Sequence, residues 1–186
     1  MTSSFLVKKP TQHFEEVLDI IQFGSSIQKG RIPNDIDVAV LYKEIPLKKQ
    51  LEISQKIKYE LGKEFDIPIH IKSYTYETLF DPSNFAKEGI LRGISIFTQT
   101  FFANRFGLEP KIHITYNLNT LDKAGKVRFN YFLNGKKGKH GFLQDSIGQL
   151  IKPGYVHLNP LYEFLFIEKM KESITYDIKV VFTYLS

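Results

Sequence analysis

The sequence contains no cysteine. A disulfide scaffold, a thiolate zinc site and a cysteine nucleophile are therefore excluded. Long apolar runs are also missing, because no stretch approaches the ~20 residues that a membrane span needs. Residues 1–10 lack an apolar run of signal-peptide length. From these absences we expect a cytoplasmic protein that has no contact with a membrane.

What is present is enough for a packed core. The chain has 186 residues, of which 42% are hydrophobic and 14% aromatic, and the charged fraction of 24% argues against wholesale disorder. This length suits one domain, or a domain of roughly 100 residues with a smaller one. Glu109 and Pro110 follow Gly107 and mark a boundary, so we expect one domain at residues 1–108 and a second at residues 109–186.

The positive charge is concentrated behind that boundary. Residues 1–108 carry 14 Lys and Arg against 13 Asp and Glu, whereas residues 109–152 carry 8 against 3. A basic patch suits polyanions such as nucleic acid or nucleotide phosphates. Solvated surface lysines are the other explanation, and the charge count alone leaves both open.

The first domain has the pattern of an α/β layer. Residues 35–40 and 67–71 alternate with the period of a strand, and Pro68 indicates an edge position or a bulge. Residues 47–62 have the apolar spacing of a helix. At Thr11 a capping box indicates either a short helix running into a strand, or a strand that starts near Leu18. The apolar run 85–106 predicts a buried helix. A strand, turn, strand, helix, strand order implies a mostly covered sheet.

The second domain is predicted to be a small basic α+β region. Alternation indicates strands at residues 111–118, 155–158 and 174–185, and apolar spacing indicates a helix at 160–171. Residues 122–133 fit either a helix or a strand.

The stretch from Phe23 to Val38 carries the chemistry. Gly24, Ser25 and Ser26 follow an apolar run, and a glycine lets the backbone approach a ligand closely. Exposed N–H groups and serine hydroxyls there suit a phosphate. Asp35 and Asp37 stand at i and i+2 on a strand and point the same way. Two such carboxylates repel each other unless a cation lies between them, and Mg²⁺ takes hard oxygen ligands of this kind.

This string resembles the signature of the DNA polymerase β-like nucleotidyltransferase superfamily, in its minimal nucleotidyltransferase form. The resemblance covers residues 11–107. It implies a nucleotidyltransferase fold with a mixed sheet flanked by helices. It also implies that Gly24, Ser25 and Ser26 hold NTP phosphates and that Asp35 and Asp37 ligate Mg²⁺ or Mn²⁺. Lys29 and Arg31 would contact phosphates as well, or would be exposed loop charges.

The resemblance also implies a third carboxylate on a later strand, which helps to bind the catalytic metal. The position that would often hold it is Pro68 here. Asp66 is the nearest acid and serves as catalytic and metal-binding residue if the strand is shifted or bulged, and otherwise it is a turn residue. His70 is a further candidate as base or ligand, or it is an ordinary edge residue.

A basic, glycine-rich turn at residues 134–141 suggests a weaker second site. Basic residues mixed with aromatics suit single-stranded nucleic acid, and an exposed hairpin turn is the alternative. The candidate nucleic-acid-binding residues are Arg128, Lys136, Lys137 and Lys139. His113 and His157 fall on expected strands, but no histidine shows a zinc-ligand spacing.

Three functions remain open on the sequence. The first is a nucleotidyltransferase that moves an NMP from an NTP to a hydroxyl on a small molecule, a nucleic acid or a protein; the resemblance makes a helical toxin-like partner credible. The second is a degenerate nucleotidyltransferase fold that binds nucleotide or nucleic acid without chemistry. The third is a nucleic-acid-binding module that uses residues 109–186.

Overall fold

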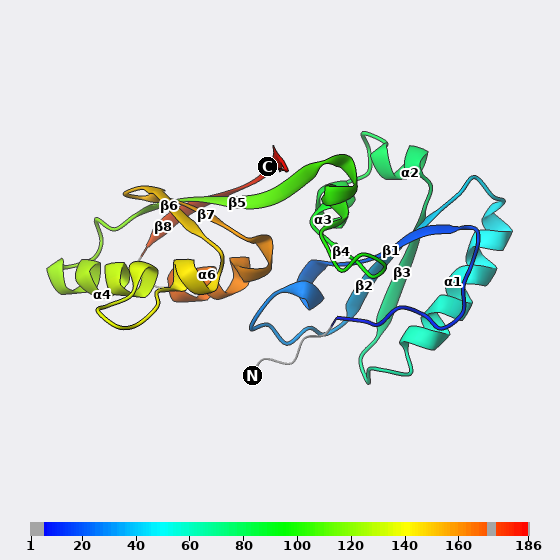
Figure 1. Ribbon diagram of the computed structural model, residues 1–186, viewed down its shortest axis with the longest axis horizontal. Coiled ribbons are helices and arrows are strands. Elements are labelled where there is room, and N and C mark those ends of the chain that lie inside the picture. The colour runs from blue at the N-terminus through cyan, green and yellow to red at the C-terminus, as the bar shows by residue number, and fades with distance from the viewer. Residues whose placement is uncertain (1–5, 171–173, 186) are drawn as a thin grey trace. The chain divides into compact units, whose positions relative to one another are not determined.

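The computed structural model of the chain describes residues 6–170 and 174–185 (Figure 1). Their contacts divide the chain into two compact units. The first unit holds the described residues up to Ile27 together with Arg31–Leu108 and Leu185. The second holds Gln28–Gly30 and the described part of Glu109–Tyr184. A three-residue piece of the loop after the glycine–serine turn therefore belongs to the second unit.

The sheet of the first unit has four strands in the order β3-β2-β1-β4. β1 (Val17–Phe23) runs antiparallel to β2 (Ile36–Tyr42) and to β4 (Ile94–Ser95). β3 (Ile69–Tyr74) runs parallel to β2. The expected mixture of α and β structure with a mixed sheet is confirmed at this level.

Helical segments cover both faces of this sheet. On one face α1 (Leu47–Leu61) buries Ile53 and Ile57 in a cluster with Val38 and Val40 of β2. The opposite face packs against α2 (Tyr76–Phe80), α3 (Lys87–Leu91) and the 3-10 helix η2 (Phe102–Phe106). Because β2 is central, its residues from Val38 to Tyr42 are all almost fully buried, with at most 1% of their surface exposed. The buried apolar side chains of β2 hold the sheet between the two layers.

The capping-box helix expected near Thr11 is wrong, because residues 6–16 contain no helix and β1 begins at Val17. The backbone N–H and the hydroxyl of Thr11 donate instead to Glu60 Oε2 on α1, at 2.8 and 3.0 Å. A distant carboxylate therefore takes the place of a local cap. The alternative of a strand that starts near Leu18 agrees with the structure.

The single buried helix expected over residues 85–106 is also wrong. The segment folds as α3, β4 and η2. Gly93 gives the physical reason, since a Cβ there would lie 2.5 Å from Ile21 Cγ2 and 2.8 Å from the Gln22 carbonyl oxygen. The backbone at Gly93 thus lies too close to β1 for any larger side chain, so a continuous helix does not form here. Instead, β4 pairs with β1 at this point.

The second unit contains another four-stranded sheet, in the order β6-β7-β5-β8. Its β7 (Tyr155–Leu158) runs antiparallel to β5 (Leu108–Asn117) and to β6 (Gln149–Lys152). The remaining strand is β8 (Thr175–Tyr184). The strands expected at 111–118, 155–158 and 174–185 are therefore present, whereas β6 was not expected.

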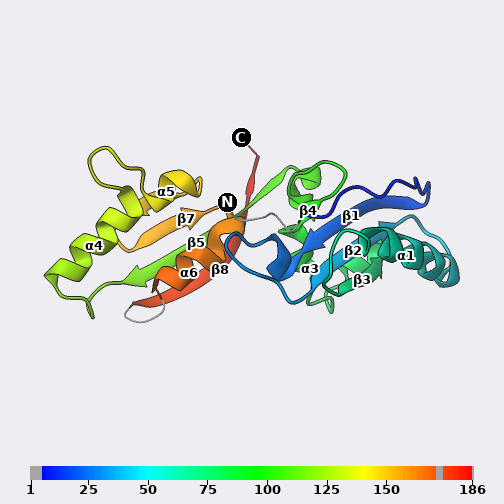
Figure 2. The ribbon, with the colours of Figure 1, turned by 90° about the horizontal axis from the view of Figure 1, so that it is seen from below.

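Three helices cover one face of this second sheet (Figure 2). They are α4 (Lys123–Asn134), α5 (Phe142–Asp145) and α6 (Glu163–Met170), the last preceded by the 3-10 helix η3 (Pro160–Tyr162). Residues 122–133, left open between helix and strand, are helical because Asp122 Oδ1 accepts a hydrogen bond from the Gly125 N–H at 2.6 Å. The core joins Ile112, Ile114, Val156 and Leu158 of the strands to Phe129 and Phe166 of the helices.

Candidate functional site

The glycine–serine turn begins directly after β1. Gly24 opens the 3-10 helix η1 (Gly24–Ile27) with φ of +76°, in the left-handed region that side chains other than glycine rarely adopt. A Cβ on Gly24 would lie 3.1 Å from Asp37 Oδ2. The bare backbone of the turn therefore lies against the carboxylate of Asp37.

Buried polar side chains stabilise the turn through hydrogen bonds. Gln22 Nε2 donates to Ser26 Oγ at 3.0 Å, and Ser26 Oγ donates to the Phe23 carbonyl oxygen at 3.2 Å. Both side chains are buried. Ser26 therefore shapes the turn. Ser25 is half-buried, and among the described residues its hydroxyl has no hydrogen-bond partner, which leaves it available to a ligand.

The two aspartates stand at the start of β2. Asp37 pairs with Phe23 of β1, and Asp35 lies two residues earlier, in the bend just before β2. Both are half-buried. Within the described part of the chain the Asp37 carboxylate has no hydrogen bond or ion pair, while Asp35 Oδ2 lies 3.9 Å from His70 Nδ1. Two carboxylates thus stand two residues apart at the entrance to β2, with little compensation from the described residues.

His70 lies on β3, two residues after the position where the third acid was sought. In the parallel pairing of β2 and β3 it lies opposite Asp37, and its side chain is 57% exposed. Asp66 is exposed three residues before β3. Among the described residues, no group of three or more His, Asp or Glu side chains could hold a metal, so neither Asp66 nor His70 completes such a group with Asp35 and Asp37. The pairing of β2 with β3, which cannot be read from the sequence, places His70 next to Asp35.

The donor set fits a magnesium ion that shares its coordination with a substrate. Mg²⁺ is usually held by one or two carboxylates, together with substrate phosphates and waters. Asp35 and Asp37 supply two carboxylates, and Asp37 lies next to the turn at Gly24. A complete cage of protein ligands is not required for this ion.

The two basic residues of the loop belong to different units. Lys29 is grouped with the second unit, where its N–H donates to the Leu161 carbonyl oxygen at 2.7 Å. The neighbouring Gln28 side chain donates to the Pro160 carbonyl oxygen at 3.0 Å. Arg31 is an exposed residue of the first unit. Gln28 and Lys29, in the middle of the loop, are therefore held by hydrogen bonds to residues of the second unit.

The candidate nucleic-acid residues of the second unit are exposed. Arg128 lies on α4, and Lys136, Lys137 and Lys139 follow in the turn between α4 and α5. The turn closes through the Lys139 N–H, which donates to the Lys136 carbonyl oxygen at 2.7 Å. An isolated antiparallel bridge pairs Lys136 with Lys139, so the segment is an exposed hairpin turn that joins α4 to α5. Lys136 Nζ lies 5.4 Å from the centre of the Tyr131 ring.

A cluster that the sequence did not single out lies on the second sheet. The rings of His113 and His157 stack at 3.7 Å with an interplanar angle of 4°. The Tyr155 hydroxyl lies 2.7 Å from His113 Nδ1 and 3.0 Å from His157 Nε2. Burial and Lys111 lower the pKa of His113, and burial, His113 and Lys111 lower the pKa of His157. The only signal in the sequence was that His113, Tyr155 and His157 alternate on expected strands.

The described helices are short. The longest of them, α1, has 15 residues, and no helix in the described ranges is long and apolar enough to cross a membrane. No family model matches the chain, and neither a curated protein nor a solved structure matches it.

Proposed function

We propose that the first unit binds a nucleoside triphosphate with Mg²⁺ or Mn²⁺ and transfers its NMP to a hydroxyl acceptor. The observation that carries this proposal is the position of the turn against the Asp37 carboxylate, since a Cβ on Gly24 would lie 3.1 Å from Asp37 Oδ2. A turn with an unbonded serine hydroxyl beside weakly compensated carboxylates suits a ligand that brings both negative oxygens and a cation. Metal-assisted nucleotidyl transfer uses this combination.

Each residue has a defined part in the proposal. The N–H groups of Gly24 and Ser25 and the Ser25 hydroxyl would donate to the β- and γ-phosphates. Asp35 and Asp37 would hold the cation, which neutralises charge on the phosphates. Ser26 would act through the turn, since its hydroxyl is already bound to Phe23.

The reaction is a displacement at the α-phosphate. The acceptor oxygen forms a bond to that phosphorus, and the bond to the bridging oxygen of the β-phosphate breaks, so pyrophosphate leaves. The acceptor proton needs a base. The proposed base is His70, whose Nδ1 lies 3.9 Å from Asp35 Oδ2. A neutral imidazole is a common general base. The acceptor is to be sought among small molecules, nucleic acids and proteins.

An alternative is a fold that binds nucleotide or nucleic acid without turnover. It is favoured by the exposed position of Asp66 and by the lack, within the described residues, of a three-ligand metal group. The two proposals share the binding site and differ only in the release of pyrophosphate.

The first experiment is calorimetric titration of ATP, GTP, CTP and UTP with Mg²⁺ or Mn²⁺. We expect metal-dependent binding to the native chain and its loss in an Asp35→Ala, Asp37→Ala double variant. The matched control is Glu15→Ala, Glu52→Ala, which removes the same charge from exposed positions of the first unit. Absence of binding to the folded native chain, or equal loss in both double variants, would overturn the proposal.

Turnover is measured separately with NTP labelled on the α-phosphate. Transfer of label to an acceptor with stoichiometric pyrophosphate supports the transferase. Binding without pyrophosphate release, across small-molecule, nucleic-acid and protein acceptors, supports the alternative.

A further inference from the structure

The outer face of the second unit's sheet carries the histidine–tyrosine cluster. Residues that alternate with the core positions point away from α4, α5 and α6. His113 of β5 pairs with His157 of β7, and Thr115 pairs with Tyr155. The Tyr155 ring stands nearly perpendicular to both imidazoles, at 84° and 87°. This side of the sheet therefore presents aromatic rings and polar groups, whereas the other side is apolar.

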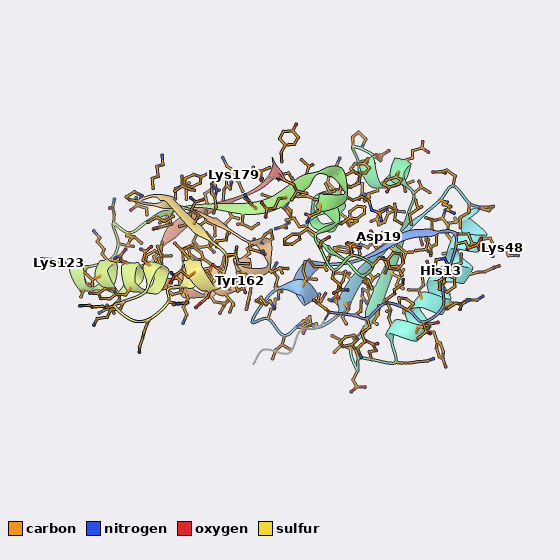
Figure 3. The ribbon with its side chains drawn as sticks, in the orientation of Figure 1. His13, Asp19, Lys48, Lys123, Tyr162 and Lys179 are labelled. Atoms are coloured by element: carbon orange, nitrogen blue, oxygen red, sulfur yellow. The ribbon has the colours of Figure 1, made fainter. Side chains whose placement is uncertain are left out.

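A cavity of about 290 Å³ opens beside these rings. Lys152 comes from β6 and Lys179 from β8 (labelled in Figure 3), at opposite edges of the sheet. Among the described residues neither ammonium group has an ion-pair partner. The lining combines these cations with hydroxyl, imidazole and carboxylate groups: His113, Thr115, Lys152, Tyr155, Asp177 and Lys179. The two unpaired ammonium groups and the exposed Thr115 hydroxyl suit phosphate oxygens.

A second, smaller cavity of about 90 Å³ lies by His157 and includes Lys111, Gln149 and Ile147. Ile147 is 80% exposed and has φ of +52°, a strained conformation for a β-branched residue. Strain of this kind is often kept at binding sites. The stacked imidazoles lie between the two cavities, because His113 lines the first and His157 the second.

We propose that this face binds single-stranded nucleic acid, with one backbone phosphate at Lys152, another at Lys179, and bases against the rings of Tyr155 and His157. Stacking on flat side chains together with lysine contacts to phosphate is how single strands are held. The charge agrees, since residues 109–186 carry 11 Lys and Arg against 7 Asp and Glu. A duplex is disfavoured because its bases stack on one another and cannot stack on the rings of the protein. The inference does not rest on nucleotidyl transfer by the first unit.

The test is fluorescence anisotropy of the full chain with labelled 12-nucleotide oligo(U) and oligo(dT), in EDTA and without NTP. We expect both single strands to bind, with log K falling against log salt at a slope of about −1.4 for two phosphate contacts. Lys152→Ala, Lys179→Ala should weaken binding at least about tenfold and flatten that slope. Tyr155→Leu, His157→Leu should weaken it by a similar factor while the slope stays unchanged.

The matched control is Lys123→Ala, Lys126→Ala, which removes the same charge from exposed positions of α4. Circular dichroism checks that each variant is folded, and Lys152→Gln, Lys179→Gln serves if the alanine variant is not. An effect confined to the sheet variants supports the proposal. Equal loss in the α4 variant, equal binding of polyglutamate or duplex, or no binding of either single strand would overturn it. Stronger binding of oligo(U) than of oligo(dT) would support the proposal with RNA as the ligand.

Discussion

Asp37 of β2 lies directly opposite His70 of β3 in the parallel register, and His70 Nδ1 lies 3.9 Å from Asp35 Oδ2. The group nearest to the aspartate pair on the neighbouring strand is thus an imidazole. The position where a third carboxylate was expected holds Pro68, two residues before His70.

The first prediction separates His70 from Asp66. His70→Ala should lower the rate of nucleotide transfer by about a hundredfold or more, because it removes the proposed base. Asp66→Ala should change it less than about threefold, since surface charges act weakly through solvent. Single-turnover rates with saturating NTP and metal measure both. The reverse order would show that Asp66 supplies the third ligand and that β3 shifts when substrate binds.

A second prediction concerns Gly24, for which the chain offers a matched control in Gly107. Both have positive φ, +76° and +71°, but a Cβ on Gly107 would meet nothing within 4 Å. Alanine at either position should cost roughly 1 kcal/mol of unfolding free energy. Only Gly24→Ala should abolish NTP binding, because its methyl group would crowd the Asp37 carboxylate at 3.1 Å from Oδ2. Urea unfolding and calorimetry measure the two effects. If both variants bind NTP normally, the turn is not the phosphate site.

A third prediction concerns a buried ion pair of the first unit. Asp19, labelled in Figure 3, lies on β1 with 1% of its side chain exposed, and its Oδ2 is 3.3 Å from Arg105 Nη2. Ser95 Oγ donates to its Oδ1 at 2.7 Å. Burial raises the pKa of Asp19, although Ser95 and Arg105 oppose the shift.

Arg105→Ala should therefore destabilise the chain by roughly 2 kcal/mol, since it leaves a buried carboxylate uncompensated. The loss should shrink at low pH, where Asp19 is protonated and needs no cation. Chemical denaturation at neutral pH and near pH 4 measures this difference. Arg92→Ala, which breaks an i,i+4 pair with the exposed Glu88, is the comparison and should cost less. A loss independent of pH would mean that Arg105 acts through packing alone.

A fourth prediction follows from the stacked imidazoles. Their pKa values are lowered from 6.5 in the folded chain, mainly by burial. Below that value the unfolded chain binds more protons than the native one, so the free energy of unfolding should fall as the pH drops through this range. Above pH 6.5 the contribution is fully present. Urea denaturation at several pH values between about 5 and 8 measures the dependence.

The control for the imidazole effect is His113→Asn, His157→Asn. This variant cannot gain the two protons, so its stability should depend less on pH over the same interval. If the native chain and the variant have the same pH profile, the stacked pair titrates normally.

Much of the fold was predictable where local pattern decides it. The strand at Asp35–Val40 and the helix that follows were readable because β2 is central and α1 is amphipathic. The segment 85–106 was not, because its apolar residues are divided between two sheet faces and Gly93 contacts β1. The Thr11 segment failed for a similar reason, since its partner, Glu60, lies 49 residues away.

The candidate site divides in the same way. Gly24, Asp35 and Asp37 could be named from the sequence because a turn and one strand position them. The approach of His70 depends on the pairing of β2 with β3, and the ring stack of His113 with His157 depends on the pairing of β5 with β7. Strand register is set by long-range contacts, so neither relationship can be found by reading along the chain.

The residues Gln28–Gly30 lie between the glycine–serine turn and β2 in sequence, yet they belong to the second unit. A Cβ on Gly30 would clash with the Leu165 side chain, which shows how tightly this piece is enclosed. Cutting the chain after Leu108 would separate this piece from Pro160, Leu161 and Leu165 of the same unit. The two units therefore cannot be obtained as separate fragments by one cut. The role of each unit has to be tested by single substitutions in the intact chain.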